Sequence, residues 1–242
     1  MIFVDIGNSH IKAAVKQGLE WERVFITAID QLPMFDQWLR SIERGTTIIV
    51  SSVRKDAGDV LTLHDDQLDI TVLDQLLLRK FEIDYKTPGT LGMDRFLVCL
   101  GANTLTGKGV IVIDSGTAVT IDMMTSDRVF MGGVIMPGLD VLHSAMHERL
   151  PELPKVSPQL YGAFPGKSTQ ECLELGLNGL YIDAIRSFVS RFREKSPKAG
   201  IFATGGGSEW IYTQLRNRFE IKVRKQLIFD GMEEAYKSYV LM

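Results

Sequence analysis

Residues 2–8 read Ile-Phe-Val-Asp-Ile-Gly-Asn, and the same pattern returns at residues 111–117 as Ile-Val-Ile-Asp-Ser-Gly-Thr. In both stretches an apolar β-strand runs into Asp, any residue, Gly and a small polar residue, and two further β-rich segments follow. A single Asp-x-Gly after a strand is an ordinary hairpin turn. Two copies with matched strands around them indicate a duplicated structural unit.

Helices and strands alternate outward from these two copies. The spacing of apolar residues and the Gly and Pro breakers predict helices over residues 32–42, 94–105, 139–149, 169–192, 209–216 and 232–239, with further strands at 47–50, 68–73 and 201–203. This alternation predicts a mixed α/β protein. We expect two domains, an N-terminal half over residues 1–106 and a C-terminal half over 107–242.

The Asp-bearing turns have the chemistry of a metal–polyphosphate site. A buried strand fixes the Asp backbone, and the Gly allows the next segment to approach a ligand closely. The carboxylate can hold Mg²⁺ directly or through water, because Mg²⁺ takes few carboxylates and keeps much of its hydration. Residues 204–207, Thr-Gly-Gly-Gly, form a third bend whose N–H groups suit a phosphate or a flat base. That bend matches neither the P-loop nor the Rossmann fingerprint.

The composition is that of an ordinary globular protein. The 242 residues are 45% hydrophobic and 24% charged, and the net charge of −3 gives no general attraction to nucleic acid or to an anionic membrane. We expect no signal peptide and no membrane span, because no apolar run is long enough. The two cysteines, Cys99 and Cys172, are expected to be free and buried, so the predicted location is the cytoplasm.

These residues together resemble the type III pantothenate kinase family. Residues 5–12 resemble its first ATP phosphate motif, residues 92–95 (Gly-Met-Asp-Arg) its substrate and catalytic motif, and residues 114–118 its second phosphate motif. Shorter matches follow in family order at 132–138, Leu150-Pro151, Ser168-Thr169 and 203–206. The resemblance implies the fold of the actin-like, sugar-kinase and Hsp70 superfamily. That fold has two RNase H-like halves, each a mixed five-stranded sheet with helices, and an ATP cleft between them.

The resemblance also implies a reaction, the ATP-dependent phosphorylation of pantothenate to 4'-phosphopantothenate, which is the first step of coenzyme A biosynthesis. Asp94 takes the position of the general base. The implied pantothenate contacts are Tyr85, Gly92, Met93, Asp94, Arg95 and Thr169. The implied ATP contacts are Asp5, Ile6, Gly7, Asn8, Ser9, His10, Ile11, Lys12 and Thr117. Asp114 matches the ligand of a monovalent cation, and Asp5 is placed to hold Mg²⁺, directly or through water.

Family members act as homodimers and need Mg²⁺ with ATP and a monovalent cation, K⁺ or NH₄⁺, so the resemblance implies the same here. Two positions depart from the family pattern, since Met93 stands where Ala is common and Ser9 replaces the usual Thr while keeping a hydroxyl. Two alternatives stay open. One is another small-molecule kinase of the superfamily, and the other is a non-catalytic transcriptional accessory protein, although the acidic net charge disfavours direct DNA binding.

His143 and His147 lie four residues apart on an expected helix, the spacing of a metal-binding pair. No Glu stands between them in a His-Glu-x-x-His pattern, and the sequence offers no evident third ligand. We therefore interpret them as surface positions of the helix.

Overall fold

The computed structural model describes residues 1–54, 56–158 and 164–240. It separates into two compact units. The first consists of Met1–Lys108, Met124–Met131 and Gln226–Met242, and the second of Gly109–Met123 and Gly132–Lys225.

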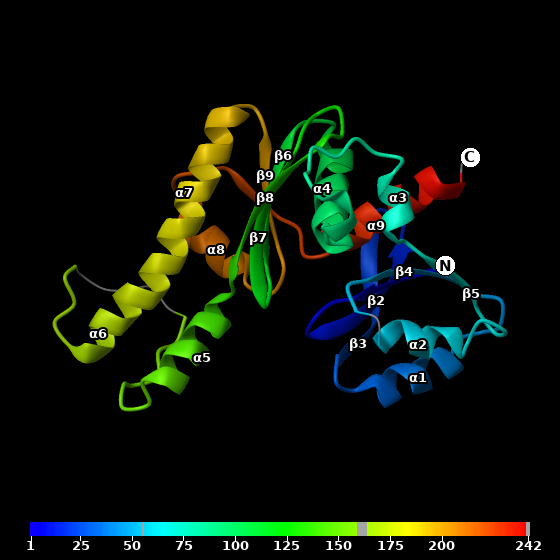
Figure 1. Ribbon diagram of the computed structural model, residues 1–242, viewed down its shortest axis with the longest axis horizontal. Helices are drawn as coiled ribbons and strands as arrows, with labels where there is room; N and C mark the ends of the chain where they lie inside the picture. Colours follow the sequence, from blue (N-terminus) through cyan, green and yellow to red (C-terminus); the bar gives the residue numbers. More distant parts are fainter. Residues whose placement is uncertain (55, 159–163, 241–242) are drawn as a thin grey trace. The chain divides into compact units, whose positions relative to one another are not determined.

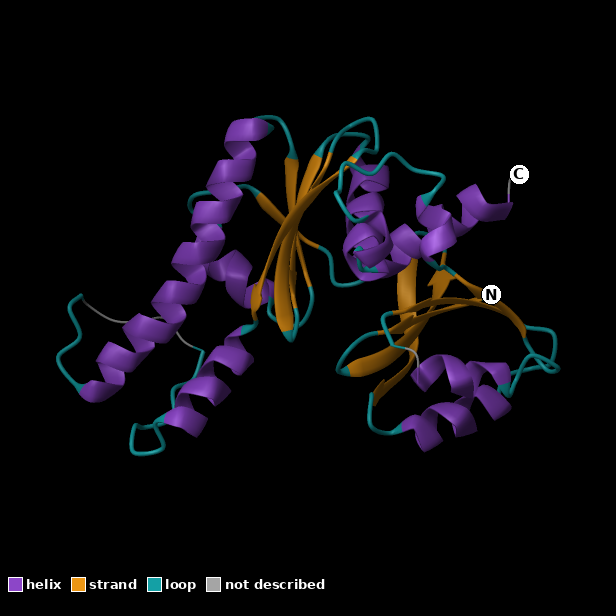
Figure 2. Ribbon diagram, in the orientation of Figure 1, coloured by secondary structure: helices purple, strands orange, loops and turns teal. Residues whose placement is uncertain are grey.

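The first unit is built on a five-stranded sheet in the order β3-β2-β1-β4-β5. β1 runs antiparallel to β2 and parallel to β4, which makes the sheet mixed. Figures 1 and 2 show α1 and α2 on one face of this sheet and α4 with α9 on the other. The strands are β1 (Ile2–Ile6), β2 (His10–Gln17), β3 (Glu20–Ala28), β4 (Thr47–Ser52) and β5 (Asp69–Val72), and the helices are α1 (Leu32–Arg40), α2 (Asp56–Thr62), α3 (Gln75–Leu78), α4 (Met93–Thr106) and α9 (Leu227–Val240).

The second unit repeats this architecture. Its sheet has the order β10-β9-β6-β7-β8, with β9 parallel to both β6 and β10. The strands are β6 (Val110–Ser115), β7 (Ala118–Met124), β8 (Phe130–Pro137), β9 (Gly200–Thr204) and β10 (Ile221–Val223), and the helices are α5 (Leu139–Arg149), α6 (Thr169–Glu174), α7 (Leu180–Lys195) and α8 (Ser208–Leu215).

The two sheets have the same connectivity. In each, the strand that carries the Asp is central, the next two strands of the chain extend one side, and the last two extend the other. The predicted mixed α/β fold with two duplicated five-stranded halves is therefore confirmed.

Alternation along β1 decides which side chains reach which helices. Val4 and Ile6 belong to the core that contains Phe35 and Leu39 of α1. Phe3 points to the opposite face, where it packs against Trp21 with ring centroids 5.1 Å apart. Because successive strand residues face opposite sides, Asp5 shares the face of Phe3, the face covered by α4 and α9.

The helix α9 ties the C-terminus to the first unit. Trp21 donates from Nε1 to Oδ1 of Asp230 at 2.8 Å, and its ring lies 5.5 Å from that of Phe229. The division by contacts thus differs from the expected halves, 1–106 and 107–242, since α9 and residues 124–131 group with the first unit.

Several local expectations differ from the structure. Asp5 and Ile6 still pair with β2, so the hairpin loop begins only at Gly7. The predicted helix over 169–192 is interrupted by a π-helical segment at Leu175–Gly179. The short elements α3 and β10 were not predicted, because three or four residues carry too little periodicity to be recognised.

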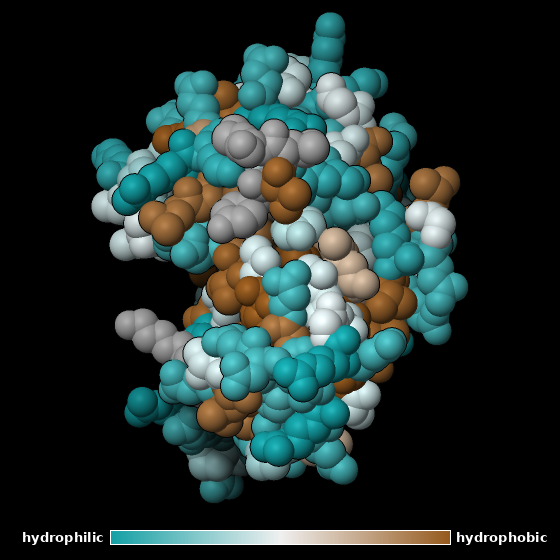
Figure 3. Space-filling model, turned by 90° about the vertical axis from the view of Figure 1, so that its right-hand side faces the viewer, coloured by the Kyte–Doolittle hydropathy of each residue, from teal (hydrophilic) through white to brown (hydrophobic). Residues whose placement is uncertain are grey.

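The surface is mainly polar with apolar groups among the polar ones, as one face in Figure 3 shows. Exposed apolar side chains include Val24 and Ile26 on β3. Within the described ranges no helix has the length and apolar character needed to cross a bilayer. Both cysteines are free, but Cys172 is exposed, whereas both were expected to be buried.

Candidate functional site

The hairpin of β1 and β2 positions the first acidic residue. Asp5 stands opposite Lys12 in the antiparallel register, and the Gly7 N–H donates to the carbonyl of His10 at 3.0 Å to close the loop. Asn8 and His10 are exposed in and beside this loop. The loop therefore presents backbone groups and polar side chains at the end of a strand whose core residues are fixed.

Asp5 is strongly affected by its surroundings. Burial raises its pKa to about 6, the charge of Lys12 lowers it, and the nearby charge of Asp94 raises it further. A carboxylate that is costly to ionise in the free protein gains from an added cation, since opposite charge favours the ionised form. Asp5 and Asp94 are close enough to couple electrostatically, so the structure brings together two carboxylates that lie far apart in the sequence.

Asp94 lies in the first turn of α4. Its Oδ1 accepts from the backbone N–H of Arg95 at 2.9 Å, which holds the carboxylate against the start of the helix. A Cβ on Gly92, the residue before the helix, would lie 2.4 Å from that oxygen. Glycine is thus required at 92 for Asp94 to adopt this position. Burial raises the pKa of Asp94, while its hydrogen bond to the Arg95 backbone and the Arg95 charge lower it.

Arg95 is buried, and aromatic rings surround its guanidinium. Its carbon Cζ lies 5.9 Å from the ring centroid of Tyr85 and 5.9 Å from that of Phe130. Nη1 also donates to the Tyr85 hydroxyl at 3.5 Å, a long hydrogen bond. Phe130 is fully buried, and its backbone pairs with residues 82–84, so it forms a fixed wall. The two rings therefore restrict the orientation of the Arg95 guanidinium group.

Asp114, near the end of β6, lies against the glycine-rich bend of the second unit. Gly205 has a φ of 82°, and a Cβ there would lie 2.4 Å from the Ser115 carbonyl oxygen and 2.5 Å from Oδ1 of Asp114. The Gly207 N–H donates to the same Ser115 carbonyl at 3.0 Å. The second and third sequence motifs therefore form one local structure within this unit.

The turn that follows β6 is also fixed from α5 and α7. The Gly138 N–H donates to the carbonyl of Thr117 at 2.9 Å, and Ser115 shares a 3.0 Å hydrogen bond with the hydroxyl of Tyr181. Thr117 itself is exposed. A ligand at this turn would meet a hydrogen-bonded backbone and an exposed threonine side chain.

The predicted site residues divide between the two units. The first unit contains residues 5–12, Tyr85 and residues 92–95, and the second contains Asp114, Thr117 and Thr169. Thr169 is exposed at the first position of α6, a different element from the β6–β7 turn. No group of three or more His, Cys, Asp or Glu side chains suited to a metal occurs among the residues described. Mg²⁺ is nevertheless usually held by one or two carboxylates and several water molecules, and Asp5 can supply such a carboxylate.

Besides Arg95, three of the predicted contacts have buried side chains. Ile6 and Ile11 are fully buried in the core of the first unit, and Met93 is only 4% exposed. The backbones of Ile6 and Ile11 also pair with neighbouring strands, so these two residues position the loop between them. The side chain of Met93, which replaces a smaller residue of the family pattern, fills the core.

Sequence reasoning did not identify Phe130 or Tyr181. Phe130 reaches Arg95, and Tyr181 reaches Ser115, only through the fold. Neither residue stands in a recognisable motif, so no signal in a single sequence would have selected them.

Known proteins similar to this chain identify its family. Residues 1–191 match the family model described as type III pantothenate kinase. A type III pantothenate kinase of Christiangramia forsetii is 33% identical over 238 residues, covering 96% of this chain and 95% of its own length. The bend at Gly205 lies beyond the family model's match but within the length that this relative covers.

Solved structures support the fold. A conserved Campylobacter jejuni protein assigned to the Baf family of transcriptional activators is 23% identical, with a TM-score of 0.67 and all of both chains covered. A Sinorhizobium meliloti protein described as a 2-dehydro-3-deoxygalactonokinase is 14% identical, with a TM-score of 0.61, covering 100% of this chain and 99% of its own. At these identities the likeness shows the actin-like sugar-kinase fold alone. The family model and the full-length relative go further, and the chain belongs to the type III pantothenate kinase family.

Proposed function

We propose that this chain transfers the γ-phosphoryl group of ATP to the primary hydroxyl of pantothenate and forms 4'-phosphopantothenate, the first step of coenzyme A biosynthesis. The family match over residues 1–191 gives the reaction. The observation that carries the assignment to particular residues is the coupled pair of carboxylates, Asp5 and Asp94, in the first unit.

Asp94 is the general base in this proposal. A primary alcohol is a poor nucleophile at neutral pH, and a positioned base that takes its proton contributes about 10²–10⁴-fold. The raised pKa of Asp94 suits this role, because a base accepts a proton more readily when its pKa is closer to the working pH. The proton passes from the hydroxyl oxygen of pantothenate to a carboxylate oxygen of Asp94 as the new O–P bond forms and the bond to the leaving ADP breaks.

Asp5 and Lys12 serve the ATP side. Asp5 would hold Mg²⁺, directly or through water, and Lys12 would balance phosphate charge from the facing position on β2. The metal supplies charge neutralisation for the transferred group. The loop over residues 7–10 offers further groups for ATP through the side chains of Asn8, Ser9 and His10, and Thr117 offers its hydroxyl. Ile6 and Ile11 hold this loop in place from the two paired strands.

Tyr85, Arg95 and Thr169 serve the pantothenate side. The guanidinium of Arg95 matches a carboxylate, and the backbone of Gly92 and Met93 at the start of α4 offers further donors. Positioning of this kind is a large part of catalysis in phosphoryl transfer, because it makes the reaction of two molecules effectively unimolecular.

Four further assignments complete the proposal. Asp114 binds a monovalent cation, K⁺ or NH₄⁺, in the structure built by the glycine-rich bend. The chain acts as a homodimer. It works in the cytoplasm, where ATP is supplied. It has no nucleic acid or membrane partner, in keeping with its weakly acidic charge.

Phosphate transfer from ATP to pantothenate, with and without K⁺ or NH₄⁺, tests the function. We expect 4'-phosphopantothenate to form and its rate to depend on both Mg²⁺ and the monovalent ion. The same assay with sugars and short acids as acceptors addresses the alternative of another kinase of the superfamily, and activity confined to one of those acceptors would overturn the assignment.

The likeness to a structure assigned to transcriptional activators raises the other alternative, a regulator. At 23% identity that likeness supports the fold and no activity. A salt-dependent gel shift on duplex DNA, together with an absence of phosphate transfer, would favour the regulator over the kinase.

A further inference from the structure

A cavity of about 180 Å³ in the second unit is lined by helix α5, the segment that follows it, α6 and the π-helical segment after α6. None of the residues assigned above to ATP, pantothenate or a cation lines it. Its polar side chains include His143, His147 and Lys155, and its apolar wall includes Leu153, Leu173 and Leu177. The two histidines are therefore partly buried around a cavity and are not the surface positions that the sequence suggested.

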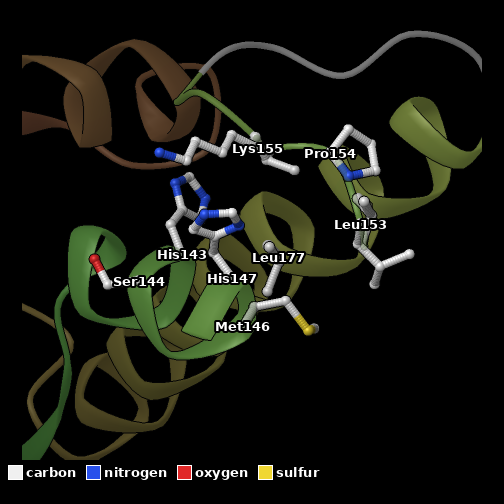
Figure 4. Close-up of a pocket in the computed structure, with 10 residues that line it drawn as sticks. His143, Ser144, Met146, His147, Leu153, Pro154, Lys155 and Leu177 are labelled. Carbon is white, nitrogen blue, oxygen red and sulfur yellow. The ribbon is translucent and has the colours of Figure 1, made fainter. Parts of the chain in front are cut away.

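The polar groups gather at one end of the cavity. His143 and His147 stand four residues apart on α5, so their rings lie on the same face of the helix. Figure 4 shows the two rings side by side and the Lys155 side chain extending towards them. Within the part of the chain that the structure describes, Lys155 makes no ion pair. Its ammonium group therefore remains available to a ligand.

One imidazole is held in place and the other has an unmet hydrogen bond. His143 Nε2 lies 2.9 Å from Oδ1 of Asn178, and Nδ2 of the fully buried Asn178 donates to the Ser157 carbonyl at 3.1 Å. His147 Nδ1 is buried and has no hydrogen-bond partner among the residues that the structure describes. A buried polar atom without a partner is costly and uncommon, so its presence beside a cavity points to a group that completes it.

The chemistry of the lining selects an anion. Neither a carboxylate nor a thiol belongs to the residues that line the cavity. Two imidazoles alone make an incomplete metal site, and the ammonium of Lys155 would repel a metal cation. An ammonium and an imidazole N–H together suit a carboxylate.

The apolar wall and the size restrict the ligand further. The volume lies below the roughly 300–1,000 Å³ of sites for drug-sized molecules, so the ligand has few heavy atoms. The three leucines in the lining favour a hydrocarbon body over a second charged group. Inorganic phosphate would leave this wall without a partner.

We propose that this cavity binds a short-chain aliphatic carboxylate. Its carboxylate accepts from Lys155 Nζ and from the imidazole of His147, and its chain packs against Leu153, Leu173 and Leu177. His143, fixed by Asn178, forms the wall beside the carboxylate.

Titration of the full-length protein with ¹³C-labelled hexanoate, followed by NMR and calorimetry, tests this proposal. We expect saturable binding with one site for each chain. Lys155→Met should weaken it at least about tenfold, as expected for loss of a charge-assisted hydrogen bond. The matched variant Lys167→Met removes an exposed lysine outside the cavity and should bind hexanoate like the unmodified protein.

Two further probes separate the parts of the proposal. Hexanol has the same chain without the charge, and inorganic phosphate has charge without a chain, so both should bind more weakly than hexanoate. Thermal unfolding of each variant checks that it is folded. Equal binding of hexanoate by both lysine variants, hexanol or phosphate binding as tightly as hexanoate, preferential uptake of Zn²⁺, or an absence of saturable binding would each overturn the proposal. Kinase activity is not the readout, so failure here leaves the proposed reaction untouched.

Discussion

Asp5 lies directly opposite Lys12 across the antiparallel pair of β1 and β2, so a carboxylate and an ammonium group share one face of the sheet. Opposite charges at this spacing usually lower the pKa of the acid. Here burial outweighs Lys12, and the charge of Asp94 adds to it, so the pKa of Asp5 rises to about 6. The free protein therefore contains a carboxylate whose ionised form is unfavourable. Binding of a cation would stabilise that ionised form.

This relationship predicts that Asp5→Asn stabilises the metal-free protein. The pKa of Asp5 is about 6 in the folded chain against an ordinary value of 3.8 in the unfolded chain. The folded state therefore binds more protons between these two pH values, and stability falls as pH rises through this window. At about pH 8 the variant should be more stable than the unmodified protein by up to about 3 kcal/mol, and the difference should shrink towards pH 4. Urea denaturation in a chelator at both pH values measures it.

The control for this experiment is Asp30→Asn, which removes an exposed carboxylate from the same unit. Its stability should follow that of the unmodified protein at both pH values. If Asp5→Asn proved no more stable than Asp30→Asn at about pH 8, the unfavourable ionisation of Asp5 would be refuted.

The assignment of Asp94 predicts a specific loss of the chemical step. Asp94→Asn keeps the size of the side chain and fits beside Gly92, but it cannot accept the proton, so kcat should fall about 10²–10⁴-fold. ATP affinity, measured by calorimetry, should change little. Asp84→Asn, in an exposed position of the same unit, is the matched control. A kcat close to that of the unmodified enzyme would remove Asp94 from the role of base.

The packing of Arg95 against Phe130 predicts an effect on substrate binding. Phe130→Leu removes the ring from the guanidinium and should raise KM for pantothenate about 2- to 30-fold, the equivalent of about 0.5–2 kcal/mol of cation–π interaction. Phe130→Tyr keeps a ring and should restore most of the affinity. Steady-state kinetics with pantothenate varied at saturating ATP gives both constants.

Loss of packing alone must be separated from that effect. Phe81→Leu serves for this, because Phe81 packs against Phe96 with ring centroids 4.9 Å apart and makes a comparable change in the same core. An equal rise in KM for Phe81→Leu and Phe130→Leu would show that general loosening, and not the contact with Arg95, is responsible.

The role proposed for Asp114 predicts a changed response to monovalent cations. Asp114→Asn fits the space beside Gly205 but lacks the charge, so activation by K⁺ or NH₄⁺ should be lost or shifted to a concentration at least about tenfold higher. Rates measured across a series of KCl concentrations at constant ionic strength test this. An unchanged activation curve would place the monovalent cation elsewhere.

A large part of the fold could be predicted because the sequence contains the same strand and turn pattern twice. The apolar strand ending in Asp-x-Gly at residues 2–8 and again at 111–117 indicated duplicated sheets, and the two sheets have the same strand order. Glycine at 107 ended the predicted helix correctly, since it adopts the left-handed conformation with φ of 62°. By contrast, the sequence did not indicate what α9 packs against, because its contacts with Trp21 and α4 join segments that are remote in the sequence.

The candidate site divides in the same way. The sequence by itself determined which residue types stand in which motifs, because strand periodicity, turn chemistry and family resemblance are local properties of the chain. Only the tertiary structure decided that Asp5 lies near enough to Asp94 to raise its pKa, that Phe130 packs against Arg95, and that Gly205 leaves space for Asp114. Those relationships depend on burial and on distances between segments remote in sequence, and both arise only when the sheets and helices pack.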